Sequence, residues 1–324
     1  MLRPEGMILA TRPGRVRDRA VHVRIVWGLF AAVGLAIFVT YWRLPPEQLY
    51  NVSEEGLELA AGRLLVFLNY PTSLAAIPIA WLSAERIGSR RAMWAAAVAT
   101  VLCAVTAWPG VVDQEDLDAK LVNVVPALGV AIAFVLSLRA PWERVGRLRL
   151  DTLRVVIGIV VWLVALVWIA AVLGFYFPGD VLLGEELRRG GDGLLHPAVH
   201  YGDHEGLDAA LLVTSALLLS RLPSGLGVSL VLGLAFVYGL LVEWRDFWFE
   251  QVNKRDWTSW SPPQVLTPRL SVGWALLVVL AVLLAFAVRR LEGPRRPGAD
   301  PRRTAPSPLP DRPSAGSTTG APLP

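Results

Sequence analysis

The chain has 324 residues, of which 54% are hydrophobic and only 18% are charged. Soluble domains place about a quarter of their residues in charge, so this composition excludes an ordinary soluble protein. The net charge is +4, but the arginines stand beside apolar runs and not along one soluble face, which excludes a nucleic-acid-binding surface. The lone cysteine, Cys103, excludes an internal disulfide, a cysteine-based zinc cluster and thiol-redox chemistry.

Long apolar runs predict transmembrane helices, because about 20 apolar residues are needed to cross a hydrocarbon core of roughly 30 Å. The predicted spans are residues 25–42, 64–82, 92–108, 121–138, 155–177, 207–220, 226–242 and 272–288. The sixth run is short for a crossing, so it is either a span or, with the seventh, a re-entrant hairpin. We therefore expect an all-α polytopic membrane protein with about eight transmembrane helices in residues 25–288.

The arginines are distributed unevenly between alternate connections. The side that holds residues 1–24, 289–324 and every second loop has 22 basic and 8 acidic residues, and the other side has 9 basic and 19 acidic residues. A Lys/Arg excess marks cytoplasmic loops, so both termini are predicted to be cytoplasmic. The preference for arginine over lysine, together with abundant Ala, Gly and Pro, indicates a bacterial inner-membrane protein.

Both terminal segments have compositions unlike the spans. Residues 1–24 form a basic cytoplasmic segment, and residues 289–324 are so rich in Pro, Gly, Ser, Thr and Arg that we expect a disordered cytoplasmic tail. The arginines in residues 289–303 lie next to the last span, where they are expected to attract anionic lipids of the inner leaflet. The predicted partner is thus the lipid bilayer, and no nucleic acid is expected.

Three of the four histidines, His196, His200 and His204, stand four residues apart, and Asp208 occupies the next interval. On a helix these side chains fall about one turn apart, where they can bind a divalent metal such as zinc. Two glycines in the stretch disfavour a helix, and a loop that gathers the histidines at a helix mouth is an equal alternative. The simplest interpretation is a polar outer loop with solvated or capping histidines, and a pH-sensing cluster is a third.

Further polar residues fall near the predicted outer ends of the spans. Asn69, Asn123 and Glu243 would line an outward-facing cavity with Asp208 if their helices are neighbours, and ionisable groups near membrane depth favour function. His204-Glu205-Gly-Leu-Asp208 resembles the H-E-x-x-H motif of zinc hydrolases, although an aspartate replaces the second histidine. That resemblance makes Glu205 a candidate general base, as is Glu243.

Three functional hypotheses follow from these features. The first is a metal-assisted hydrolase or transferase acting on an envelope or lipid-linked substrate, with the three histidines and Asp208 as ligands and Glu205 or Glu243 as the base. The second is a transporter that uses the proline-broken second span and the short sixth run as discontinuous helices. The third is a non-catalytic structural or assembly protein that presents its outer loops to a partner.

Overall fold

A computed structural model describes residues 21–49, 52, 55–108, 120–142, 145–177, 187–189, 195–197, 199–266 and 268–292. Most of the basic segment 1–24 and the tail beyond Glu292 lie outside the described residues. The predictions for those two segments therefore stay predictions.

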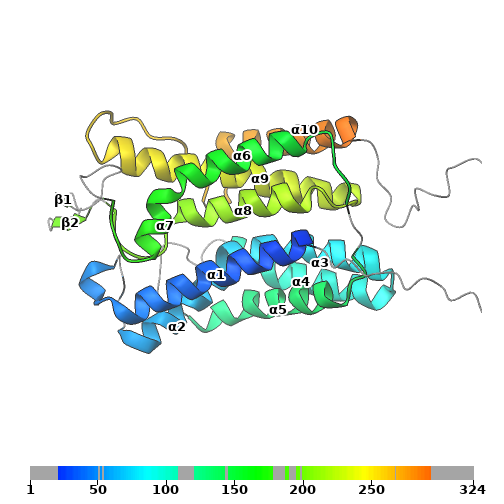
Figure 1. Cartoon of the computed structure of the whole chain (residues 1–324), viewed down its shortest axis with the longest axis horizontal. Coiled ribbons are helices and arrows are strands. Elements are labelled where there is room, and N and C mark those ends of the chain that lie inside the picture. Colours follow the sequence, from blue (N-terminus) through cyan, green and yellow to red (C-terminus); the bar gives the residue numbers. More distant parts are fainter. Residues whose placement is uncertain are drawn as a thin grey trace, which may run out of the picture.

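The described residues form helices that run along one long axis (Figure 1). They are α1 (Val21–Arg43), α2 (Gly56–Phe67), α3 (Ser73–Ile87), α4 (Arg90–Ala104), α5 (Val124–Arg139), α6 (Asp151–Val164), α7 (Leu166–Val172), α8 (Glu205–Leu219), α9 (Leu226–Trp248) and α10 (Val272–Glu292). Short turns of 3-10 helix cover Pro46–Gln48, Val105–Ala107 and Leu121–Asn123, and wide π-type turns cover Leu68–Thr72 and Phe249–Asn253. Strands β1 (Leu187–Arg189) and β2 (Leu195–Pro197) pair antiparallel, with Arg188 opposite His196.

Six helical segments of the described chain are long and apolar enough to cross a membrane: Val21–Arg43, Gly56–Ile87, Arg90–Ala107, Leu121–Arg139, Leu226–Asn253 and Val272–Glu292. The bent pair α6 and α7, with an angle of 52° between the two helices, makes a seventh if it is one span. These segments overlap the predicted runs, and an all-helical membrane bundle is confirmed at this level. The predicted count of eight differs because α8 has only 15 residues.

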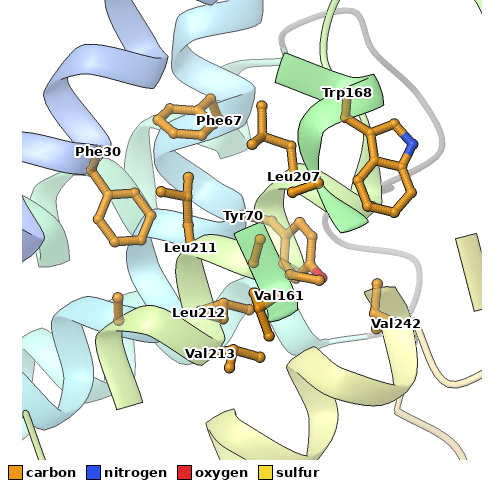
Figure 2. Packing of buried hydrophobic residues seen from close by; sticks show 14 of the residues in the cluster. Phe30, Phe67, Tyr70, Val161, Trp168, Leu207, Leu211, Leu212, Val213 and Val242 are labelled. Atoms are coloured by element: carbon orange, nitrogen blue, oxygen red, sulfur yellow. The ribbon is translucent and has the colours of Figure 1, made fainter. Parts of the chain in front are cut away.

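Helix α8 is short and lies at the centre of the hydrophobic core. Nearly every side chain in its first two turns is buried, and the helix contacts α1, α3, α6, α7 and α9. Figure 2 shows Leu207, Leu211 and Leu212 of α8 among Phe30, Phe67 and Trp168 from other helices. Surrounding protein therefore replaces lipid around α8, which explains a helix that is apolar all round.

Small residues bring neighbouring backbones close together, as is typical of helices packed within membranes. Alanines of α3, α4 and α5 form a second core cluster. Gly233 of α9 lies against α10, where an added Cβ would stand 2.6 Å from the carbonyl oxygen of Ala281. The α9–α10 contact thus depends on the absence of a side chain at that position.

Side-chain contacts join the helix ends at each end of the bundle. At one end, Arg154 of α6 pairs with Glu292 of α10 at 2.8 Å, and Arg289 of α10 donates to the Ser224 carbonyl after α8 at 3.1 Å. At the opposite end, Arg63 of α2 pairs with Asp203 before α8 at 3.0 Å. Strands β1 and β2 also lie at that second end (Figure 1). Each of these contacts joins residues that the sequence analysis assigned to the same side.

We expect Gly233→Ala to destabilise the bundle by about 1–3 kcal/mol, because the new methyl group overpacks against the α10 backbone. Gly227→Ala in the same helix is the matched control, since nothing lies within 4 Å of the position that its new methyl group would occupy. Thermal unfolding in detergent measures both variants. Equal unfolding temperatures for the two would contradict the close α9–α10 approach.

Candidate metal centre

A histidine and two carboxylates meet where α8 begins and α9 ends. His204 directly precedes α8 in an extended conformation, with φ −135° and ψ 143°. Asp246 and Glu250 lie one helical turn apart on α9 and the wide turn that follows it. One potential ligand atom from each of the three residues lies within 4.8 Å of the other two. This group, His204, Asp246 and Glu250, is called the carboxylate–histidine cluster below.

Each side chain of the cluster also forms a hydrogen bond with a group outside the cluster. The Nε2 atom of His204 donates to the His200 carbonyl at 2.9 Å, while its Nδ1 faces Oε1 of Glu250 at 3.3 Å. The other Glu250 oxygen accepts from Nε1 of Trp168 at 2.8 Å. One oxygen of Asp246 accepts from the Gly206 amide at 2.7 Å. A shared ligand would therefore take the place of the contact between Nδ1 of His204 and Oε1 of Glu250.

The cluster is withdrawn from solvent, since the exposed fractions of His204, Asp246 and Glu250 are 5%, 9% and 3%. Buried ionisable groups need a charged partner or a bound metal. Burial lowers the pKa of His204, but the neighbouring Glu250 carboxylate outweighs this and raises that pKa to about 9. The Glu250 carboxylate thus favours a proton on Nδ1 of His204, which a metal ion at the cluster would have to displace.

The residues next to His204 in the chain pack closely around the cluster. The His200 ring stacks on the His204 ring with centroids 4.2 Å apart, and burial together with the His204 charge holds the pKa of His200 well below its usual range. Gly206 allows the first turn of α8 to approach Trp168, because an added Cβ would lie 2.3 Å from the indole ring. A side chain at position 206 would thus separate Trp168 from Glu250.

A buried ion pair adjoins the cluster. Arg63 donates to Oδ2 of Asp203 at 3.0 Å, and both side chains are almost fully buried. The other Asp203 oxygen accepts from the His204 amide at 3.1 Å, and the Asp203 amide donates to the Tyr41 hydroxyl at 3.1 Å. Asp203 therefore connects α1 and α2 to the residue that supplies the histidine of the cluster.

The predicted histidine set is only partly brought together. His204 joins the cluster and His200 stacks on it, whereas the backbone of His196 belongs to β2. Helix begins only at Glu205, so the loop interpretation of this stretch agrees with the structure. Asp208 lies in the first turn of α8, and its buried Oδ1 has no hydrogen-bond partner.

The two candidate bases lie close to the cluster along the chain but differ in their surroundings. Glu243 is one turn before Asp246 on the same face of α9, is 4% exposed, and has one buried oxygen without a hydrogen-bond partner. Glu205 is half-buried and faces Arg245 at 3.5 Å. Glu243 is thus the carboxylate with an uncommitted oxygen.

The two predicted cavity-lining asparagines contact each other instead of the cluster. Nδ2 of Asn69 donates to the Asn123 carbonyl at 2.7 Å, and Nδ2 of Asn123 donates to Oδ1 of Asn69 at 3.1 Å. Asn69 is fully buried. These bonds tie the broken stretch between α2 and α3 to the start of α5.

Asp246 and Glu250 were not predicted as site residues. With Glu243 they are spaced three and four residues apart, which places three carboxylates on one face at the end of a membrane helix. That spacing was the available signal. Their contact with His204, more than 40 positions earlier in the chain, has no local pattern in the sequence.

No protein-family model, curated protein or solved structure matches this chain. The nature of the site is therefore argued from its donor atoms. One imidazole nitrogen and two carboxylate oxygens suit zinc or manganese, which accept mixed nitrogen and oxygen ligands.

We expect Asp203→Asn to destabilise the protein by about 3–5 kcal/mol, because it leaves the buried Arg63 guanidinium without a counter-charge. The asparagine retains the oxygen that accepts the His204 amide, so the change is confined to charge. The double variant Arg63→Met/Asp203→Asn removes both charges and should recover much of the loss. Thermal unfolding in detergent measures the difference, and equal losses in the single and double variants would contradict the ion-pair interpretation.

Proposed function

We propose that this chain is a membrane-embedded, metal-dependent hydrolase or transferase that acts on an envelope or lipid-linked substrate. The observation that carries the proposal is the arrangement of His204, Asp246 and Glu250, whose ligand atoms lie within 4.8 Å of one another and each of which is fixed by a further hydrogen bond. Metal-binding histidines commonly donate their second ring nitrogen to a carbonyl or carboxylate, as His204 does.

A divalent cation at the cluster would polarise a water molecule and the group that the water attacks. Glu243 is the residue we assign as the base, since its free oxygen can accept the proton that the water loses. Glu205 is the second candidate, but its pairing with Arg245 competes for the same carboxylate. Of the other predicted ligands, His200 stacks on His204, and neither His196, His200 nor Asp208 belongs to the proposed donor set.

Aromatic side chains at the same end of α9 favour an amphiphilic substrate. Trp244, Trp248 and Trp260 pack together, with Trp248 and Trp260 centroids 5.2 Å apart. Trp244 and Trp260 remain substantially exposed. Tryptophan is favoured at the membrane–water interface, so these rings suit a lipid-linked substrate that reaches the cluster from the bilayer surface.

The arginine distribution supports an orientation for this site. We propose that both termini are cytoplasmic in a bacterial inner membrane and that the cluster lies on the outer side. We further propose that α8 completes an eighth crossing, since its 15 residues rise about 22 Å inside the protein and its flanking connections extend it at both ends.

The burial of the cluster also supports a second candidate function, in which the metal site is structural. Structural metal sites are closed by protein ligands, whereas catalytic sites keep a position for substrate. A closed centre would make the chain a non-catalytic structural or assembly protein in which the metal fixes residues 199–204 to α9. Transport has less support, because Asn69 of the broken span is engaged with Asn123 at the start of α5.

Purified protein is expected to bind about one zinc or manganese ion per chain, measured by elemental analysis after dialysis against the metal. His204→Ala and Glu250→Gln should lower metal affinity at least tenfold, because each removes a donor. Glu85→Gln at the opposite end of the bundle is the control and should bind metal as the unchanged protein does. Absence of metal, or equal binding by all three variants, would contradict the proposed centre.

The base assignment separates the two candidate functions. Glu243→Gln should retain metal and lose turnover of lipid-linked phosphates or esters in detergent. Metal retention with no turnover by either the unchanged protein or this variant would favour the structural centre.

The orientation is tested by labelling in intact cells with a membrane-impermeant thiol reagent. The only native thiol, Cys103, is buried and should stay unlabelled. Ser259→Cys, in the exposed segment after α9, should react, whereas Ser89→Cys between α3 and α4 should react only after lysis. The reverse pattern would place the cluster on the cytoplasmic side.

A further inference from the structure

A groove with a cavity volume of about 130 Å³ opens between α6 and α10 at the end of the bundle opposite the cluster, with α8 and α9 as its floor. Most of its lining is apolar, contributed chiefly by Leu153, Ile157, Leu217, Phe236, Leu284 and Val288. Its polar side chains, Arg154, Arg289 and Glu292 among them, come from the helix ends. The groove is therefore amphipathic along its length.

The walls of the groove lie in helices that have the length and composition of membrane spans. Helices α9 and α10 are candidate spans, and α6 belongs to the bent pair. Exposed apolar side chains such as Leu283 and Phe286 flank it on α10. An occupant of the apolar part must itself be apolar, which in a bilayer means a hydrocarbon chain.

The two arginines at the polar end of the groove differ in whether a carboxylate pairs with them. Arg154 donates to both oxygens of Glu292, at 2.8 and 2.9 Å, and also faces Asp151 at 3.2 Å. Arg289 donates through Nη1 to the Ser224 carbonyl and the Ser229 hydroxyl, and forms no salt bridge with a carboxylate of the described residues. Arg289 thus holds a positive charge at the groove that is not neutralised by those residues.

We propose that this groove binds an anionic phospholipid, with an acyl chain between α6 and α10 and the phosphate against Arg289. Arginine favours phosphate because its planar guanidinium presents paired donors. The serine contacts fix Nη1 and leave Nε and Nη2 for the phosphate oxygens. This proposal does not rest on the proposed metal chemistry, which lies at the other end of α8.

Arg290 provides a matched control, because it is the adjacent arginine on α10 but is exposed to solvent. The full chain is delipidated in detergent and titrated with phosphatidylglycerol or phosphatidylcholine, and bound lipid is measured by native mass spectrometry. We expect tighter binding of phosphatidylglycerol. Arg289→Gln should weaken that binding about tenfold, the loss expected for one charge-assisted contact, whereas Arg290→Gln removes an arginine outside the groove and should have a clearly smaller effect.

Leu284→Trp tests the apolar part separately, since a larger side chain narrows the groove and should lower binding of both lipids. Soluble glycerol phosphate tests whether a phosphate alone is sufficient, and it should not displace the bound lipid at millimolar concentration. Equal binding of the two lipids, equal losses in Arg289→Gln and Arg290→Gln, or displacement by glycerol phosphate would each overturn the proposal. If Leu284→Trp fails to fold, the comparison of Arg289→Gln with Arg290→Gln still tests the proposal.

Discussion

Burial of charge at the start of α8 is the constraint on which this end of the structure depends. Arg63, Asp203 and His204 are withdrawn from water, and charged groups in such surroundings are costly unless each finds a partner. Asp203 pairs with Arg63 through one oxygen and accepts from the His204 amide through the other, while Glu250 faces the His204 ring. One short segment of chain therefore fixes the relative positions of α2, α8 and α9.

That constraint also explains why α8 is unlike the other helices. A transmembrane helix that faces lipid needs about 20 apolar residues, but α8 is surrounded by protein and ends in charged groups that other helices neutralise. Its 15 residues can be short because its N-terminus does not have to reach water. Its apolar surface meets side chains such as Phe67 and Trp168 instead of acyl chains (Figure 2).

Much of the architecture could be predicted from the sequence, since lipid imposes long apolar runs that are visible in one dimension. The ends of the helices were less predictable. The seventh apolar run stops at Val242, yet helix continues to Trp248 because Glu243 and Asp246 are buried in protein and not exposed to lipid. A hydropathy profile predicts whether a residue lies in lipid or in water. It misplaces the end of a helix where that end is surrounded by protein.

The candidate site was predictable only in part, for a related reason. The histidine spacing drew attention to His204. The regularly spaced residues do not lie on one helix, however, because α8 begins only at Glu205. The carboxylates that face His204 come from a distant helix, and such pairings are set by tertiary packing alone. Asp208, placed in the predicted set by its interval, belongs to the helix and not to the cluster.

The bent pair of α6 and α7 contacts both ends of the protein, which gives the lipid groove a connection to the cluster. Helix α6 forms one wall of the groove through Leu153 and Ile157, and α7 carries Trp168, whose indole holds Glu250. Only Ala165 separates the two helices. A lipid that fixes α6 against α8 would therefore also restrict the position of Trp168. The second oxygen of Glu250 accepts a hydrogen bond from that indole, so the bent pair that lines the groove also orients one carboxylate of the cluster.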